Sequence, residues 1–117
     1  MKDDLKSYLP LTPATLHIML ALAAEDRHGY AIMQEVARQS VDQYKLGPGT
    51  LYENLDKLAA RGLVKRTSSP SSSEDSRRRY YRLTDLGRRV VSADVERLKS
   101  VVKEAKLHLP AAESSRS

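Results

Sequence analysis

The side chains best suited to chemistry lie between Gly47 and Gly62, and the chemistry they favour is hydrogen bonding to nucleic acid rather than catalysis. Apolar residues recur at helical spacing through this stretch, which predicts one short helix with one face on a core. The opposite face carries a hydroxyl, a carboxylate, an amide and two cations (Thr50, Glu53, Asn54, Lys57 and Arg61). Amides pair with adenine, lysine reaches guanine acceptors and a carboxylate accepts from cytosine, so this face is predicted to read the DNA major groove.

Both ends of this helix are marked in the sequence. Pro48 suits the first helical position, because its missing N–H has no helical partner there, and Gly47 can serve as the N-cap. Gly62 can adopt the left-handed backbone that ends helices. The N–H groups of Gly49 and Thr50 would then lie at the positive helix end, where they could hold a phosphate.

A strongly basic strand pair follows the helix. Residues 63–67 and 77–83 have the composition of strands, and the serine-rich loop 68–76 between them predicts a hairpin with a long tip. Between residues 65 and 82 the chain has six basic and two acidic residues, which leaves +4 of the formal net charge of +5. We expect this hairpin to attract DNA phosphates, although its arginines could also form a solvated strand edge that discourages aggregation. The basic residues are Lys65, Arg66, Arg77, Arg78, Arg79 and Arg82.

Two further helices must hold the candidate recognition helix in place. Thr12 and Pro13 give a start signal for a nearly all-apolar helix over residues 14–24, which we expect to be buried on all sides. After a polar break, Gly29 permits a tight turn or a close helix approach, and a second amphipathic helix runs to about Gln39. Its predicted apolar stripe consists of Tyr30, Met33, Val36 and Ala37. The order of three helices, a hairpin and a last helix predicts a mainly α fold with a small β-hairpin, a winged helix-turn-helix. The hairpin over residues 63–83 forms its wing.

The last predicted helix begins after its N-cap, Thr84, and runs to Leu109. Its apolar residues alternate in steps of four and three, which is the seam of a coiled coil. At 1.5 Å per residue the helix spans roughly 38 Å, longer than a small three-helix core can cover. The seam therefore predicts a homodimer, and packing on the chain's own core is the alternative. The predicted dimerisation residues are Val91, Val95, Leu98, Val102, Ala105 and Leu109, together with Leu16 of the first helix.

The length of 117 residues fits one domain with a terminal extension. We expect residues 1–83 to form the DNA-binding domain with an N-terminal arm, 84–109 to form the dimerisation helix and 110–117 to be a disordered tail. The chain has no cysteine, no apolar run near the ~20 residues of a membrane span and no apolar signal core at its start. These features favour a cytoplasmic protein with no membrane partner.

No pattern typical of catalysis or metal binding stands out. The sequence has no cysteine nucleophile, no glycine-rich phosphate loop and no Ser-x-x-Lys or His-Glu-x-x-His pattern. His17, His28 and His108 share no ligand spacing. We therefore predict that the chain is not an enzyme and needs no metal or cofactor.

Several short segments, in their order and spacing, resemble the PadR family of transcriptional regulators, in its short form with a single C-terminal helix. They are the Leu20–Ala23 run leading to His28-Gly29-Tyr30, the Gly49-Thr50-Leu51-Tyr52 sequence with Leu55 and Leu58, Arg61-Gly62-Leu63-Val64, Arg79-Tyr80-Tyr81, and Leu83-Thr84-Asp85-Leu86-Gly87. The resemblance covers about residues 11–109. One departure is Glu53, where the family commonly has proline, so the base preference stays open.

The resemblance implies a homodimer, built through the last helix with help from the N-terminal helix, that binds a pseudo-palindromic operator, usually as a repressor. It places Tyr52 and the basic wing residues at the DNA backbone, with half-buried packing as an equal alternative for Tyr52. Some family members bind small aromatic effectors at the dimer interface, but without Trp or Phe this chain has only its six tyrosines for stacking. The alternative function is a protein-interaction or dimerisation module without specific DNA binding, because the recognition helix is close to neutral.

Overall fold

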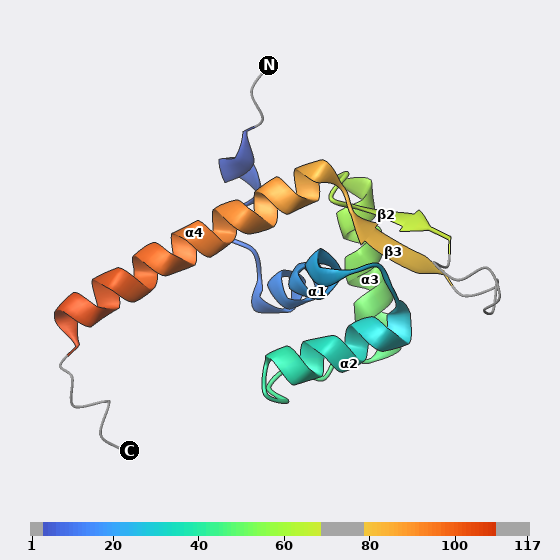
Figure 1. Ribbon diagram of the computed structural model, residues 1–117, viewed down its shortest axis with the longest axis horizontal. Coiled ribbons are helices and arrows are strands. Elements are labelled where there is room, and N and C mark those ends of the chain that lie inside the picture. The colour runs from blue at the N-terminus through green and yellow to red at the C-terminus, as the bar shows by residue number, and fades with distance from the viewer. Residues whose placement is uncertain (1–3, 69–78, 110–117) are drawn as a thin grey trace.

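The computed structural model describes residues 4–68 and 79–109, so residues 1–3, 69–78 and 110–117 lie outside the description below (Figure 1). A short 3-10 helix, η1 (Leu5–Tyr8), precedes three helices, α1 (Pro13–Ala24), α2 (Gly29–Gln39) and α3 (Pro48–Ala60). A small sheet and the long helix α4 (Asp85–His108) follow. The predicted fold class, mainly α with a small β element and a long last helix, is confirmed.

The start and stop signals of the sequence act where we expected them. The Thr12 side chain accepts a hydrogen bond from the Thr15 N–H at 3.2 Å, with a proline at the start of α1. Gly47 caps α3 with no side-chain hydrogen bond, and Gly62 beyond its end has a φ of +78°. At α4 the Thr84 hydroxyl accepts from the Gly87 N–H at 2.9 Å. Thr12 and Thr84 thus each pair a backbone N–H that the helix itself cannot pair, whereas Gly47 leaves such groups open at the start of α3.

The core lies where α1, α2 and α3 meet. It is formed by aliphatic residues of all three helices, with Ile32 and Val36 from α2 and Leu51 and Leu55 from α3 fully buried. The predicted apolar stripe of α2 was wrong at Tyr30, which is 63% exposed. Because Gly29 already lies against α3 at the start of the helix, the buried positions three and seven residues later are Ile32 and Val36, and Tyr30 falls outside them.

Helix α1 is the central helix, but one flank of it remains partly open. Ile18, Met19 and Leu22 are fully buried, whereas Leu16 and Leu20 are only half-buried. Polar contacts tie α1 to α2 on another side, where the His17 ring nitrogen Nδ1 lies 3.2 Å from the Gln39 amide oxygen. The prediction of burial on all sides therefore holds for only part of α1.

The sheet has three antiparallel strands in the order β1-β3-β2, not the two we predicted. The predicted hairpin is present as β2 (Val64–Thr67) and β3 (Tyr80–Leu83), paired from Val64 with Leu83 to Thr67 with Tyr80. The additional strand, β1 (Arg27–His28), comes from the segment we interpreted as a polar break. Two residues are too few to show a strand period, so the pattern could not reveal it. Of the predicted second strand, Arg77 and Arg78 lie outside the described residues, and Arg79 precedes β3.

Helix α4 joins the domain at its first half and projects away from it at its second half (Figure 1). Gly87 lies so close to the chain before β2 that a Cβ there would stand 2.1 Å from the Leu63 carbonyl oxygen. Val90 and Val91 are buried in the core, while Val102 is 51% and Leu109 62% exposed. The 24 residues of α4 span about 36 Å, so the helix outreaches its own domain.

Candidate nucleic-acid interface

Helix α3 divides into a buried and an exposed face. Leu51, Leu55 and Leu58 point into the core. Of the predicted base-reading residues, Thr50, Glu53 and Lys57 are exposed, as is Gly49 in the first turn. These four residues, together with the exposed part of Tyr52, are the part of the predicted interface on α3 that the structure leaves open to a partner.

Asn54 and Arg61 lie on the flank of α3 that faces α1 and the N-terminal segment. The Asn54 amide oxygen accepts from the Thr15 hydroxyl at 3.1 Å, and its amide nitrogen donates to the Thr50 carbonyl at 2.9 Å. The Arg61 guanidinium stacks on the Tyr8 ring, 4.6 Å from its centroid. A groove of about 340 Å³ lies between them, lined also by Thr15 and Lys57. Because both side chains already hold α1 or the N-terminal segment, their geometry favours positioning α3 rather than contacting bases.

Asp56 belongs to the outward face, where the sequence prediction counted its charge in the near-neutral helix but did not place it. The residue is exposed, and its charge acts on the Tyr81 hydroxyl of the wing. A helical wheel at about 100° per residue would have placed it beside Glu53, away from the leucine stripe. The exposed face of α3 therefore carries two carboxylates against one lysine, and its charge is not what would draw DNA to it.

Tyr52 lies where α3, α2 and the wing meet. Its side chain is 40% exposed, and its ring centroid is 6.5 Å from that of Tyr81 on β3. Its hydroxyl end fills the space beside Gly29 at the start of α2. The half-buried packing role we considered for Tyr52 is thus present in the structure, and the exposed part of the ring is still available to a partner.

The described wing cations fall on opposite faces of the sheet. Arg66 lies directly opposite Tyr81 in the strand pair, so the two side chains share one face of the sheet. Side chains alternate along a strand, so the neighbouring pair points to the other face. Lys65 pairs with Arg82 on the other face. Burial is the main cause that raises the pKa of Tyr81, and the charge of Tyr52 adds to it, while the charges of Arg66 and Arg79 oppose that shift. Arg66 and Arg79 therefore lie near Tyr81, the wing residue whose ring packs against Tyr52 of α3.

Arg82 is bound within the protein. Its guanidinium makes a two-pronged contact with the Asp26 carboxylate, with Nε 3.1 Å from both oxygens and Nη2 2.8 Å from Oδ2. This hydrogen bond raises the pKa of Arg82 and ties the wing to the segment before β1. The sequence count of wing charge included Arg82, so the charge open to a phosphate is smaller than that count. Arg77 and Arg78 lie outside the described residues.

The histidines have structural contacts. The His17 ring also lies 5.6 Å from that of Tyr44, and His28 caps α2 by accepting from the Ala31 N–H at 3.4 Å. His108 contacts Glu104 one turn earlier in α4 at 2.8 Å. Within residues 4–68 and 79–109, no three His, Asp or Glu residues come together as a metal site would require. No helix in that same part of the chain has the length and apolarity needed to cross a membrane.

Comparison with known proteins decides the family. Residues 18–93 match the model of the Transcriptional regulator PadR-like family, and they contain α2, α3, the wing and the start of α4. The chain belongs to the PadR-like family. Its predicted resemblance to that family is therefore confirmed. Because this is a family of transcriptional regulators and not of enzymes, the prediction that the chain is not an enzyme is confirmed as well.

Individual proteins resemble this chain in sequence or in fold. Transcriptional regulator Rv3488 of Mycobacterium tuberculosis is 35% identical over 76% of this chain and 78% of its own length. The crystal structure of a PadR family transcription regulator from Clostridium difficile R20291 covers 85% of this chain and all of its own, with 26% identity and a TM-score of 0.67. Bacillus subtilis PadR, solved in complex with operator DNA, has the same fold at 19% identity and a TM-score of 0.59, over 72% of this chain and 47% of its own.

Proposed function

We propose that this PadR-like protein is a sequence-specific DNA-binding transcriptional regulator, acting in the cytoplasm as a homodimeric repressor on a pseudo-palindromic operator. The observation that carries the proposal is the exposed polar face of α3, joined through Tyr52 to the wing strand beside which Arg66 and Arg79 lie. A helix of this shape fits the major groove, and cations beside it fit the phosphates on either side. The operator complex of Bacillus subtilis PadR is a precedent for this use of the same fold.

The start of α3 supports a phosphate contact. Gly47 provides no side-chain cap and Pro48 no N–H, so the N–H groups of Gly49 and Thr50 lie at an open, positive helix end. A Cβ at Gly49 would meet nothing within 4 Å, so the fold itself does not require glycine there. Alanine would favour the helix, and we attribute the glycine to the close approach of a phosphate to the backbone.

We assign three kinds of contact. Thr50, Glu53 and Lys57 would reach base edges, and Arg66 and Arg79 would contact the backbone, joined on sequence grounds by Arg77 and Arg78. Lys65 lies on the other face of the sheet, and Tyr52 would act through its packing against Tyr81 and Gly29. Asn54 and Arg61 would act through the contacts that hold α3 to α1 and to Tyr8. The wing would supply most of the attraction, since α3 carries Glu53 and Asp56 on its outward face.

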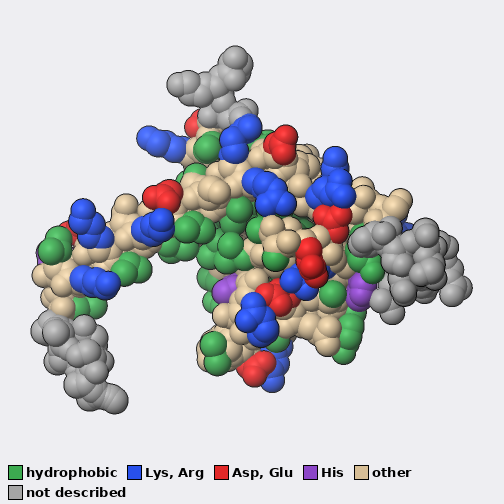
Figure 2. Space-filling model, in the orientation of Figure 1, with side chains coloured by type: hydrophobic (Ala, Val, Ile, Leu, Met, Phe, Trp, Pro, Cys, Tyr) green, Lys and Arg blue, Asp and Glu red, His purple; other side chains and the backbone are tan. Residues whose placement is uncertain are grey.

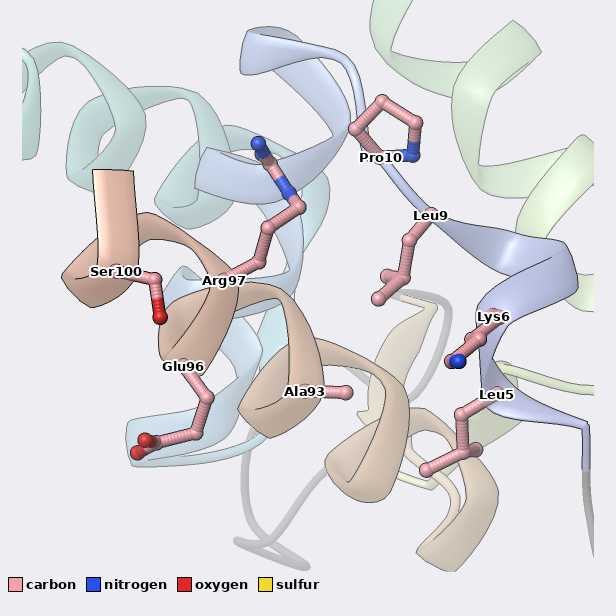
Figure 3. Close-up of a pocket in the computed structure, with 8 residues that line it drawn as sticks. All are labelled: Leu5, Lys6, Leu9, Pro10, Ala93, Glu96, Arg97 and Ser100. Atoms are coloured by element: carbon pink, nitrogen blue, oxygen red, sulfur yellow. The ribbon is translucent and has the colours of Figure 1, made fainter. Parts of the chain in front are cut away.

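Two apolar surfaces support the homodimer. Val101, Val102 and Leu109 are exposed on the projecting half of α4, and hydrophobic side chains follow the underside of that helix onto the adjoining domain (Figure 2). Near the root of the projection, a hollow of about 600 Å³ lies between the N-terminal segment and α4. Leu5 and Leu9 line it from one side (Figure 3).

A second copy could cover both surfaces at once. In a two-fold arrangement the projecting α4 of each copy would lie along the other, so that the apolar seam of one copy covers the N-terminal side of its partner. The α4 residues across the hollow are Ala93, Glu96, Arg97 and Ser100, so the α4 side is mostly polar (Figure 3). We place Leu16, half-buried on α1, in the same interface together with the predicted seam of α4 from Val95 onward. Val91, which we predicted to be part of that seam, is buried in the chain's own core instead.

Relief of DNA binding by a small aromatic effector is a second proposal. It is supported by the volume of the hollow, which lies in the range of ligand sites. Thermal-shift screening with aromatic compounds tests it, because a ligand of the folded state raises the melting temperature. If no compound raises it, the effector proposal is lost and the DNA proposal is untouched.

Selection of duplexes from a random pool tests the main proposal. The purified protein should enrich a sequence with two related half-sites whose centres lie about one helical turn, ~34 Å, apart. Binding to the selected duplex should weaken as salt rises and should exceed binding to a scrambled duplex. A stable dimer that enriches no sequence would instead favour the protein-interaction alternative.

A further inference from the structure

Gly29 is buried at the first position of α2, and the lack of a side chain there has a specific use. A Cβ at this position would stand 2.1 Å from the Tyr52 hydroxyl oxygen and 2.8 Å from Cζ of the same ring. Real Cβ contacts are essentially never so short. Gly29 has no left-handed backbone that would call for glycine. The glycine is therefore explained by the space it leaves for the end of the Tyr52 side chain.

The ring seated in that space links three elements of the fold. Tyr52 belongs to α3, its ring packs at 51° to that of Tyr81 on β3, and its hydroxyl end meets the start of α2. Gly29 follows β1 directly, where His28 pairs with Tyr80 and contacts its ring at 5.3 Å. The seat of Tyr52 is thus attached through β1 to the same strand, β3, that the ring packs against.

We propose that Gly29 is a positioning residue for DNA reading: it forms a socket for Tyr52 that fixes the placement of α3 relative to the wing. The inference rests on the proposed function. Gly29 is buried and would not itself touch DNA. Its effect on DNA binding passes through the position of Tyr52. We expect that effect on base reading and not on phosphate binding, because base edges must be met in register while phosphates can be met by mobile cations.

Gly29→Ala is the direct test. The added methyl group meets the far end of a side chain that is 40% exposed, so the ring can swing into solvent and the fold need not open. Affinity for a duplex selected by the wild-type protein from a random pool should fall about tenfold, the size of one lost base contact. Affinity for a scrambled duplex should change less than twofold, because phosphate contacts do not depend on base register. A loss shared equally by both duplexes would contradict a positioning role.

Tyr52→Leu supplies the matched background. Leucine leaves the socket empty, so adding Gly29→Ala to Tyr52→Leu should change affinity for the selected duplex less than twofold. A further tenfold loss in the double variant would show that Gly29 acts by some other route, and the socket would be refuted. Should Gly29→Ala fail to fold, Tyr52→Leu alone should still lose preference for the selected duplex, and retention of that preference would overturn the proposal.

The socket and the proposed function can fail separately. If the wild-type protein prefers no duplex, the function fails, and a crystal structure of Gly29→Ala still tests the socket. That structure should show the Tyr52 ring displaced from Tyr81. An undisturbed ring would refute the socket even in a protein that binds DNA specifically.

Discussion

Helices α3 and α4 are both amphipathic, and each leaves a face that no described residue covers, but the two faces are chemically opposite. On α3 the leucines are buried and Thr50, Glu53 and Lys57 are exposed. On the far half of α4 the apolar seam itself is exposed, at Val102 and Leu109. An amphipathic pattern predicts a helix in both cases but not its partner. The chemistry of the open face does that: a polar face beside cations suits a polyanion, and an apolar face suits a second copy.

The largest expected effect comes from the apolar face. Val102→Glu places a charge in the exposed seam, outside the domain's own core, so each chain should fold and the dimer should dissociate. Loss of the second half-site should reduce affinity for a selected duplex by about 100-fold or more. Sedimentation equilibrium and fluorescence anisotropy measure the two effects. Lys103→Gln, which changes the charge equally on an exposed neighbouring position, should remain dimeric. If Val102→Glu also remains dimeric, the seam does not join the copies.

The next effect concerns the two faces of the wing. Replacing Arg66 and Arg79 together with alanine should weaken binding to selected and scrambled duplexes alike, about tenfold, and reduce the salt slope by about two per chain. Lys65→Ala is the control, since Lys65 lies on the sheet face away from Tyr81 and should alter the slope by less than one. Titrations at several salt concentrations measure both. Equal slopes for the double variant and the wild type would exclude Arg66 and Arg79 from the phosphate contacts.

A smaller effect should separate stability from binding at the start of α3. Gly49→Ala should raise the free energy of unfolding by roughly 0.5–1 kcal/mol, because alanine favours the helix and the site has open space. The same methyl group should lower affinity for all duplexes several-fold, since it stands where a phosphate would approach. Denaturant titration and anisotropy should therefore move in opposite directions. A variant that gains stability and binds DNA with unchanged affinity would show that no phosphate binds at this helix end.

The smallest effect comes from Glu35, which lies on neither of these faces, so its substitution serves as a reference. Hydrogen bonding to Arg38 is the main cause that lowers the pKa of Glu35 from 4.5 to about 2. Because the folded pKa is below the unfolded one, the stabilisation is present above about pH 4.5 and is lost as pH falls toward 2. Glu35→Gln should cost no more than about 1 kcal/mol near pH 7, since Arg38 is exposed to screening solvent. Dimerisation and DNA binding should be unchanged. The difference in stability from the wild type should shrink on acidification, and an equal difference at pH 7 and pH 2 would contradict the assignment.

The sequence predicted the elements whose signals are local. Helix caps at Thr12, Gly47 and Thr84 were identified because capping depends on one residue type at one position. The strand β1 was not predicted, because its two residues form a strand only by pairing with β3, far along the chain.

The candidate site was likewise predicted only where its signals are local. The polar face of α3 followed from helical spacing, whereas the contacts of Asn54 with Thr15 and of Arg82 with Asp26 join segments distant in sequence. No periodicity reports such pairs, so two residues that looked free to meet DNA proved to be engaged by other side chains of the same chain. Asp56 is different, since a helical wheel alone would have placed it on the outward face.

Hydroxyl-radical footprinting on a duplex selected from a random pool tests the central claim most directly, because it reports both open faces in one experiment. A dimer joined through α4 and reading DNA with two copies of α3 should protect two patches centred about one helical turn, ~34 Å, apart. Val102→Glu should abolish both patches together at concentrations where the wild type protects them. A single protected patch that survives this substitution, or no protection at any concentration that keeps the dimer intact, would contradict the account.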